Sequence, residues 1–398
     1  MDITIYPRKL KGIVPAIPSK SQAHRILICA AFSREITHMV CPDTNQDIEA
    51  TADCLRSLGA QITRTNDGYE IIPVQSPPKI ATLNCMESGS TLRFMLPICC
   101  ALGVETTFLM SGRLPYRPLS PMWEELERMG CKLSKPTEDT IRTQGKLRNG
   151  KFTIDGSVSS QFITGLLFAL SLITGENTLS VTGNIESKPY IDLTAQVMKL
   201  FSMEFDGCRF INPTGYRSPG KITVEGDWSN GAFFLAAKAL GNDISVTGLS
   251  IDSLQGDKAA DELFKALDEN ITVCGKDIPD LIPILAVTAG AKNGATFQNI
   301  GRLRLKESDR IAAIAEMLNV LGAKTQINQD QMTVFPAKYH GGIIDSHNDH
   351  RIAMSAAIAS TAASGPITIL NAQCVNKSYP QFWSEFTRLG GYYEQYIR

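Results

Sequence analysis

Cations and hydroxyl residues gather where apolar helical segments of the sequence begin. One segment opens with Lys20 and Ser21 and has Arg25 about one turn later, and another opens at Gly89 with Arg93 in its first turn. Backbone N–H groups at a helix N-terminus lack partners and carry partial positive charge, so they attract anions. An Arg in the first turn of a buried helix also needs an anion, and a structural salt bridge is the alternative to a ligand. These positions therefore predict binding sites for anionic substrates.

More cations occur at later helix starts and loops. The segment 302–310 combines four cations with two carboxylates, and the alternative to a binding site there is a solvated charged turn. The segment 159–161 offers neutral hydrogen-bond donors, which plain helix capping would also explain. The cations at such positions are Lys20, Arg25, Arg93, Arg117, Lys306, Arg310, Arg351 and Lys377. One phosphate needs far fewer. Two phosphorylated substrates bound together are indicated, with carboxylates nearby to move protons.

The helical segments that carry these residues recur along the chain. Six apolar segments begin near residues 21, 89, 159, 229, 279 and 349. Each is followed by a short strand, by a helix with apolar residues at i, i+3, i+4 and i+7, and usually by a hairpin. This order predicts an α/β protein made of six βαβαββ repeats, three per domain, with the fourth cut short after Leu267.

The first helix of each repeat is apolar nearly all round and must be buried on every side. We therefore expect two domains, each an inside-out α/β barrel with three helices at its centre and sheets outside. The length of 398 residues suits two domains. If the central helices are parallel, their N-termini emerge on one face of each domain. Two such faces across a cleft would hold anionic substrates although the net charge is only −1.

Composition narrows the class of protein. Hydrophobic residues make up 43% and charged residues 20%, as in soluble globular proteins, and the net charge of −1 gives no field for nucleic acid or a membrane. We expect a cytoplasmic protein, because residues 1–12 have no apolar segment after their charges and no apolar run approaches about 20 residues. Ten cysteines without a CxxC pair and five histidines without ligand spacing favour reduced, buried thiols and no metal.

Five segments resemble, in order, the motifs of the 5-enolpyruvylshikimate-3-phosphate synthase family. They are SKSQAHR (19–25), SGSTLR (88–93), SKPYID (187–192), LKESDR (305–310) and NDHR (348–351). The resemblance implies transfer of the enolpyruvyl group of phosphoenolpyruvate to the 5-hydroxyl of shikimate 3-phosphate, through a tetrahedral intermediate that loses phosphate. It implies no metal or organic cofactor. It also implies domains 1–14 plus 224–398 and 15–223, with the active site in the cleft between them.

The resemblance also assigns residues. For shikimate 3-phosphate it implies Lys20, Ser21, Arg25, Ser159, Ser160, Gln161, Ser187, Asp280 and Lys306. For phosphoenolpyruvate it implies Lys20, Gly89, Arg93, Arg117, Gln161, Arg310, Arg351 and Lys377. The implied catalytic residues are Asp280, which would take the 5-hydroxyl proton, Glu307, which would act near the methylene carbon, and Lys20. Without the resemblance, the position of Asp280 beside a helix start is typical of a helix cap.

The chain departs from the family pattern at Glu87, where many members carry an Asn that contacts phosphoenolpyruvate. Gly89 is kept, which implies sensitivity to the phosphonate inhibitor glyphosate.

The alternatives are a UDP-N-acetylglucosamine enolpyruvyl transferase, an RNA-end-processing enzyme and a non-catalytic phosphate-binding protein. The UDP-N-acetylglucosamine enolpyruvyl transferase would need a Cys in 112–118 and Asn at position 21. The RNA-end-processing enzyme would need a basic face. A non-catalytic phosphate-binding protein would have no need for the carboxylates Asp280 and Glu307. We expect a monomer with small-molecule partners, and neither nucleic acid nor membrane.

Overall fold

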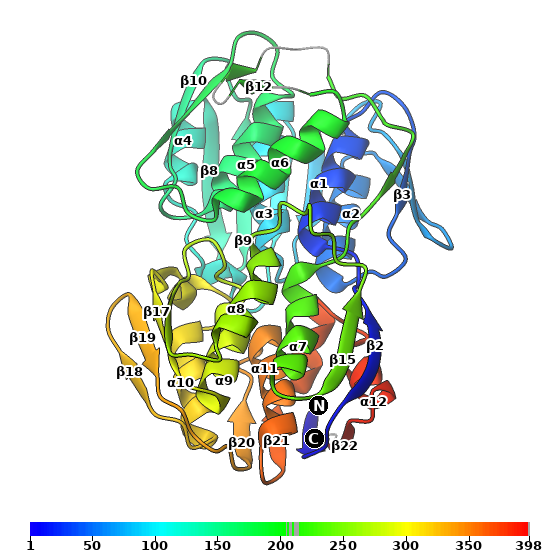
Figure 1. The fold of residues 1–398 in the computed structure, drawn as a ribbon. Helices are drawn as coiled ribbons and strands as arrows, with labels where there is room; N and C mark the ends of the chain where they lie inside the picture. The colour runs from blue at the N-terminus through cyan, green and yellow to red at the C-terminus, as the bar shows by residue number, and fades with distance from the viewer. Residues whose placement is uncertain (204, 207–208, 211–214, 397–398) are drawn as a thin grey trace. The chain divides into compact units, whose positions relative to one another are not determined.

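The computed structural model describes residues 1–203, 205–206, 209–210 and 215–396. It divides into two compact units. Unit 1 contains Met1–Ile17 and Glu225–Arg398, and unit 2 contains Pro18–Val224. Both mix helices and strands (Figure 1), so the α/β class is confirmed. The domain limits at residues 14 and 223, and a cleft as the site, stay predictions.

Six helices in this fold are buried along almost their whole length. Unit 2 holds α1 (Lys20–Ala31), α3 (Gly89–Leu102) and α5 (Ser160–Leu170), and unit 1 holds α7 (Trp228–Ala239), α9 (Ile282–Ala291) and α11 (His350–Ala359). In unit 1, each of these three helices contacts the other two. Their sequences lack a polar face, so packing on all sides is the only way to keep them from water.

Side chains cap five of these six helices at the residue before the first turn. The capping residues are Ser19, Ser88, Ser159, Asp227 and Asp349, each of which accepts a hydrogen bond from a backbone N–H two or three residues later. The exception is α9, which follows Leu281 and has no side-chain cap. A cap uses one of the N–H groups at a helix start and leaves others for a ligand.

Each repeat also has a second, amphipathic helix. These are α2 (Gln46–Ser57), α4 (Met122–Arg128), α6 (Lys188–Leu200), α8 (Ala260–Ala266), α10 (Arg310–Val320) and α12 (Phe382–Arg388). Among them, α4 begins only after Pro121, because the residue before a proline disfavours the helical conformation, and it ends before Gly130, whose φ is 112°.

Unit 2 has three four-stranded sheets of one design, in which the first two strands are parallel and the third is antiparallel to the second. The sheets are β14 (Lys221–Thr223), β3 (Thr37–Val40), β5 (Gly68–Ile72) and β4 (Gln61–Arg64); β6 (Ile80–Asn84), β7 (Glu105–Leu109), β9 (Thr140–Gly145) and β8 (Cys131–Thr137); and β10 (Lys151–Asp155), β11 (Thr178–Thr182), β13 (Arg209–Phe210) and β12 (Phe205–Asp206). The first strand of the first of these sheets, β14, thus comes from the C-terminal end of the unit 2 sequence.

Unit 1 repeats this design twice and then departs from it. The complete sheets are β16 (Ile271–Cys274), β17 (Ala295–Gln298), β19 (Gln331–Val334) and β18 (Thr325–Ile327); and β20 (Gly342–Asp345), β21 (Ile367–Leu370), β1 (Asp2–Tyr6) and β22 (Tyr392–Tyr396). The fourth repeat has only β2 (Lys11–Pro15) parallel to β15 (Asp243–Thr247). Only residues 267–270 separate α8 from β16, which leaves no room for a hairpin.

Cysteines fill space in these units. All cysteines in the described part of the chain carry free thiols, and all of them except Cys274 are buried. The expectation of buried thiols therefore fails at Cys274, which lies on the exposed side of β16. Cys208 lies outside the described residues.

Close packing of α5 on α3 depends on Gly165. A Cβ at this position would overlap the carbonyl oxygen of Arg93 and lie 2.9 Å from Pro97 Cγ. We expect Gly165→Ala to lower the free energy of unfolding by about 1–3 kcal/mol, since the backbone of α3 must move, as urea titration would measure. Gly231→Ala in α7 is the control, because its Cβ would meet only the end of the Leu249 side chain, at 3.1 Å. Equal losses in both variants would contradict this account.

Candidate active site

Arg25 is a buried cation on α1 whose partners in unit 2 are all neutral. Its Nε donates to Thr194 Oγ1 at 2.9 Å, Nη1 to the carbonyl oxygen of Ser21 at 2.6 Å, and Nη2 to that of Tyr190 at 2.9 Å. Among described residues no carboxylate forms an ion pair with Arg25, so the alternative of a structural salt bridge does not hold there. Burial lowers the pKa of Arg25 to about 10. Two of its five N–H groups remain for an anionic ligand.

Lys20 begins α1 and lies beside the next helix of the same unit. Its Nζ forms an ion pair with Asp47 Oδ2 at 2.9 Å, with both side chains about one-sixth exposed. Asp47 is the second residue of α2, where a carboxylate also stabilises the helix dipole. The motif containing Lys20 gave no indication of this partner. Asp47 keeps the amine in place, and a bound anion can share it.

The start of α3 and the loop before α4 bring two more arginines to one glycine. A Cβ on Gly89 would lie 2.6 Å from Arg117 Nη1 and 2.7 Å from Arg93 Nη1. Gln161 Oε1 accepts a hydrogen bond from Arg93 Nη1 at 3.4 Å, and Gln161 Nε2 donates to Ser90 Oγ at 2.9 Å. The structure therefore collects these predicted residues, which are far apart in sequence, around Gly89, which is buried.

Three of the four predicted serines of unit 2 lie at the starts of α5 and α6. Ser159 caps α5, as the alternative of plain capping expects, and Ser160 is its buried first residue. Ser187 is buried before α6 with φ of 52°, a left-handed conformation that is uncommon outside glycine. The carbonyl oxygen of Tyr190, in the first turn of α6, accepts from Arg25, so α6 begins beside the Arg25 guanidinium. We call Lys20, Ser21, Arg25, Gly89, Arg93, Arg117, Ser159, Ser160, Gln161 and Ser187 the unit 2 cluster.

Unit 1 surrounds one carboxylate, that of Asp280, with three cations. Arg310 Nη1 donates to Asp280 Oδ1 at 2.7 Å, Arg351 Nη2 lies 3.1 Å from Oδ2, and Lys306 Nζ lies 3.5 Å from Oδ1. The interpretation of Asp280 as a helix cap is wrong, because α9 begins at Ile282 and has no side-chain cap. The carboxylate is instead held by residues 26 to 71 positions away in the sequence.

Burial and charge act in opposite directions on the groups around Asp280. Burial raises the pKa of Asp280, but Arg351, Lys306 and Arg310 outweigh it and hold that pKa well below its usual range. Burial lowers the pKa of Lys306 to about 8, although Asp280 opposes the shift. Asp280 is therefore ionised, and Lys306 loses its charge not far above neutral pH.

Arg310 links the carboxylates of this part of unit 1. It is 1% exposed, and besides Asp280 it contacts Glu307 Oε2 at 2.6 Å and Asp349 Oδ2 at 2.8 Å. Asp349 also caps α11, and Lys377 Nζ donates to the carbonyl oxygen of Asn348 at 2.7 Å. Asp349 belongs to a motif but was not among the predicted site residues. We call Asp280, Lys306, Glu307, Arg310, Arg351 and Lys377 the unit 1 cluster.

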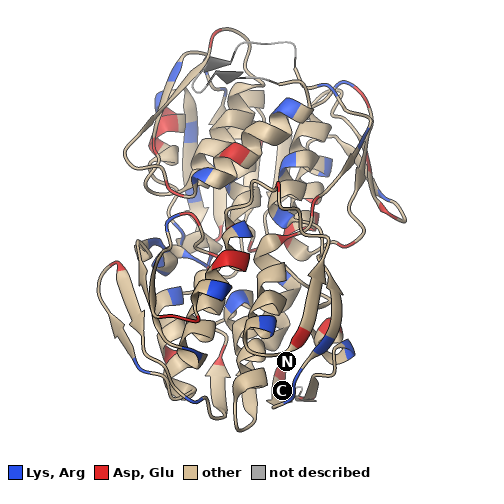
Figure 2. Ribbon diagram, in the orientation of Figure 1, with Lys and Arg blue, Asp and Glu red and all other residues tan. Residues whose placement is uncertain are grey.

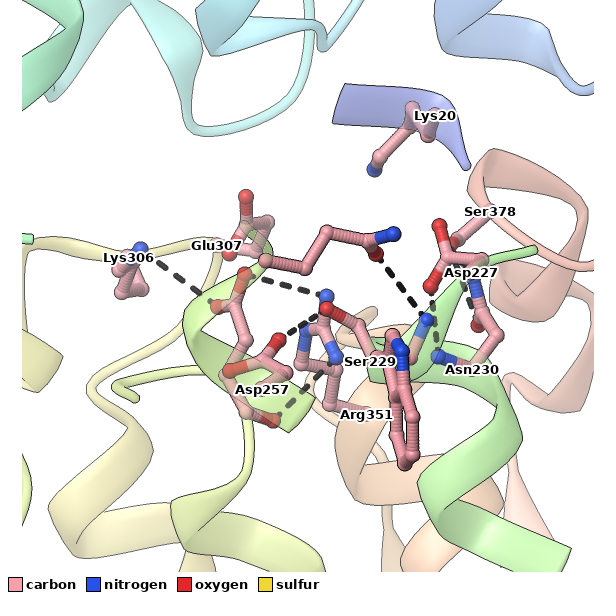
Figure 3. Close-up of polar contacts among 12 residues, drawn as sticks. Lys20, Asp227, Ser229, Asn230, Asp257, Lys306, Glu307, Arg351 and Ser378 are labelled. Atoms are coloured by element: carbon pink, nitrogen blue, oxygen red, sulfur yellow. Dashed lines mark hydrogen bonds and ion pairs between the residues drawn. The ribbon is translucent and has the colours of Figure 1, made fainter. Parts of the chain in front are cut away.

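A second carboxylate near Asp280, that of Asp257, was not predicted as a site residue. It is fully buried and accepts a hydrogen bond from Ser229, in the first turn of α7 (Figure 3). Burial, followed by the charge of Asp280, raises the pKa of Asp257 to about 6, while Arg351 opposes the rise. Ser229 follows the pattern of polar residues at helix starts, but Asp257 lies in a short 3₁₀ helix that carries no such signal.

Charges of both signs are interspersed along the described chain (Figure 2). Anion binding would therefore be local to the two clusters rather than a property of a basic face. Within the described residues, no group of three His, Cys, Asp or Glu side chains is arranged to hold a metal ion.

The fold has close counterparts among solved structures. The EPSP synthase from Acinetobacter baumannii matches 99% of this chain and 100% of that chain with a TM-score of 0.80 and 22% sequence identity. The enolpyruvyl transferase NikO from Streptomyces tendae matches 99% of this chain and 98% of that chain, with a TM-score of 0.76 and 17% identity. The two-unit architecture is thus that of the enolpyruvyl transferases.

Sequence comparison narrows the class to one family. Residues 5–386 match the family described as EPSP synthase (3-phosphoshikimate 1-carboxyvinyltransferase). The chain is 38% identical to a 3-phosphoshikimate 1-carboxyvinyltransferase of Clostridium beijerinckii, over 99% of each chain. It is also 38% identical to one of Clostridioides difficile, over 98% of this chain and 97% of that one. The chain belongs to the EPSP synthase family, which confirms the resemblance inferred from the five motifs.

The buried position of Arg310 makes it a test of the unit 1 cluster. We expect Arg310→Ala to lower the free energy of unfolding by about 3–5 kcal/mol, because Asp349 would be left buried without its cation. Urea titration of the purified variant measures this loss. The control is Arg304→Ala, whose ion pair with Asp309 has both side chains 38% exposed and should contribute less than about 1 kcal/mol. A similar, small loss in both variants would contradict the arrangement.

Proposed function

We propose that this chain transfers the enolpyruvyl group of phosphoenolpyruvate to the 5-hydroxyl of shikimate 3-phosphate and releases phosphate. The observation that carries the proposal is the convergence of Lys306, Arg310 and Arg351 on the carboxylate of Asp280. This convergence supports a role for Asp280 as a proton acceptor beside bound anions. Family membership supports the same reaction, because the curated relatives are named for it.

Each substrate has its proposed set of residues. For shikimate 3-phosphate these are Lys20, Ser21, Arg25, Ser159, Ser160, Gln161, Ser187, Asp280 and Lys306. For phosphoenolpyruvate they are Lys20, Gly89, Arg93, Arg117, Gln161, Arg310, Arg351 and Lys377. Arg25 supports the first set because its two remaining N–H groups can donate to a phosphate. Arg93 and Arg117 support the second because their guanidinium groups meet at Gly89. Both sets draw on residues of both clusters.

The addition step needs one proton added to phosphoenolpyruvate and one removed from the 5-hydroxyl, and the elimination step needs one removed from the new methyl group. In our proposal Glu307 delivers a proton to the methylene carbon of phosphoenolpyruvate, and the neighbouring carbon becomes electrophilic. The 5-hydroxyl oxygen bonds to that carbon while Asp280 accepts its proton. In the elimination step, Glu307 takes a proton back from the new methyl group of the tetrahedral intermediate, the carbon–carbon double bond forms again, and phosphate leaves. Arginine and lysine side chains stabilise the carboxylate and the leaving phosphate.

Asp280 is a weak base while three cations surround it. Substrate phosphate and carboxylate groups would compete with Asp280 for Lys306, Arg310 and Arg351. When these cations also contact substrate anions, they stabilise the ionised form of Asp280 less. The pKa of Asp280 then rises, and the carboxylate accepts the hydroxyl proton more readily. Binding of both anionic substrates would thus make the base effective.

The setting we propose is the cytoplasm, with small molecules as the only substrates and a single chain as the complete catalytic unit. No helix in the described residues has both the length and the apolar character that a membrane crossing needs. A net charge of −1 supports partners other than nucleic acid.

Phosphate release from phosphoenolpyruvate tests the reaction. We expect release with shikimate 3-phosphate as acceptor and none with UDP-N-acetylglucosamine. Glu307→Gln and Lys20→Ala should each lower kcat/KM by at least about 100-fold, because one removes a proton donor and the other a positioned cation. Release with the nucleotide sugar alone would assign the chain to the sister reaction, and full activity in both variants would refute their roles.

Lys306 predicts a pH dependence of substrate binding. Its pKa of about 8 means that the charge is present at pH 7 and lost as the pH rises through 8. The KM for shikimate 3-phosphate should therefore increase between pH 7 and 9. Lys306→Arg is the matched control, since arginine keeps its charge across this range and its KM should stay nearly constant. The same increase in both proteins would trace the effect to another group.

Gly89 predicts sensitivity to glyphosate, a phosphonate that resembles phosphoenolpyruvate in charge. Millimolar glyphosate should inhibit the wild-type chain. In Gly89→Ala the new methyl group would displace the guanidinium groups of Arg93 and Arg117, so inhibition should weaken and the KM for phosphoenolpyruvate should rise together. Wild-type activity unchanged by millimolar glyphosate would contradict the assignment of this subsite.

A further inference from the structure

A line of buried hydrogen bonds joins three helices of unit 2. His24 Nδ1, on α1, lies 2.7 Å from Thr51 Oγ1 on α2. Thr51 Oγ1 in turn lies 2.7 Å from Thr91 Oγ1 on α3, which donates to Ser88 Oγ at 2.7 Å. Each of these residues is at most 1% exposed. We call His24, Thr51, Thr91 and Ser88 the buried network.

The hydrogen bonds of the buried network run in one direction. Thr91 has one hydroxyl hydrogen, which goes to Ser88 Oγ. The alternative acceptor, the carbonyl oxygen of Asp47, lies 3.5 Å from Thr91 Oγ1. In either case Thr91 accepts from Thr51, and Thr51 then accepts from His24 Nδ1. The network therefore needs a histidine N–H at Nδ1.

His24 takes part in this network as a neutral donor. Burial, together with the charges of Lys20 and Arg25, holds the pKa of His24 well below its usual range, so the ring carries a single N–H. Its other ring nitrogen, Nε2, has no hydrogen-bond partner within the described part of the chain. A buried acceptor without a partner costs free energy, which an apolar side chain at position 24 would avoid. Donation from Nδ1 therefore explains a histidine here better than packing does.

The buried network ends beside the proposed phosphoenolpyruvate subsite. Ser88 is the cap of α3, and its Oγ also accepts from Thr91 N at 3.3 Å. The next residue, Gly89, packs against the guanidinium groups of Arg93 and Arg117. Any shift of the α3 start against α1 and α2 would therefore move Gly89 and Arg93 together.

We propose that His24, Thr51 and Thr91 are positioning residues, which hold the start of α3 in place for phosphoenolpyruvate. A connected set of buried hydrogen bonds fixes one arrangement of three helices more narrowly than apolar contacts do. The proposal rests on the proposed function, from which it takes the subsite. Arg25, the residue after His24, is held by Thr194 of α6 instead, so the network acts on phosphoenolpyruvate rather than on shikimate 3-phosphate.

Steady-state kinetics of matched variants test this role. Thr51→Val removes the middle hydroxyl with little change in shape, and the KM for phosphoenolpyruvate should rise about five- to tenfold, the effect of one lost hydrogen bond. The KM for shikimate 3-phosphate should stay unchanged. Thr51→Ser keeps the hydroxyl and should restore most of the wild-type KM. The control is Thr37→Val, because Thr37 is fully buried on β3 and its hydroxyl pairs with Ser218 Oγ at 2.8 Å, outside the network.

A double variant separates the network from two independent effects. Thr91→Val breaks the same connection one step further on, so it should raise the same KM. If both residues act through one network, Thr51→Val with Thr91→Val should raise the KM no further than the larger single effect. Effects that multiply in the double variant would contradict a shared role.

Hydrogen exchange measures the hold on α3 without turnover. Deuterium uptake by peptides that cover residues 88–95 should be faster in Thr51→Val than in the wild type, and Thr37→Val should keep the wild-type rate. Absence of turnover in the wild type would refute the proposed function and leave exchange to decide the positioning role. Wild-type exchange in Thr51→Val, or an equal rise in KM for both substrates, would overturn the proposal.

Discussion

A helix with no polar face cannot meet water, and this constraint organises each unit of the chain. Burial of α1, α3 and α5 in one unit, and of α7, α9 and α11 in the other, leaves their first N–H groups as the main polar features of the core. Caps such as Ser88 and Asp349 satisfy some of these groups. Cations in the first turns, including Arg25 and Arg93, then turn the helix starts into places where an anion is needed.

The two clusters meet the cost of buried charge in different ways. Arg25 in unit 2 is surrounded by neutral oxygens and is ready for an external anion. In unit 1, Arg310 is neutralised by Asp280, Glu307 and Asp349, so positive charge is already balanced there. A substrate can bind strongly in unit 1 only by sharing cations with Asp280. That exchange links substrate binding to the basicity of the proposed catalytic carboxylate.

The sequence predicts what depends on local pattern and misses what depends on distant contacts. Lys20 and Arg25 could be identified because helix starts have a local signature, and the missing hairpin after Leu267 is visible as a short segment. The role of Asp280 came only from resemblance, since local pattern favoured a helix cap and its partners lie up to 71 residues away. Asp257 has no local signal, because its environment is made by Ser229 and by the charges of Asp280 and Arg351.

The competition between Asp280 and the substrates for three cations is the central claim, and binding measured apart from turnover tests it most directly. Calorimetry would compare phosphoenolpyruvate binding to the wild-type chain and to Asp280→Asn, each saturated with shikimate 3-phosphate, before turnover or with an unreactive analogue. The account predicts that the variant binds phosphoenolpyruvate several-fold more tightly, because Arg310 and Arg351 are released, while phosphate release is lost. Weaker binding in the variant, or turnover that survives, would contradict it.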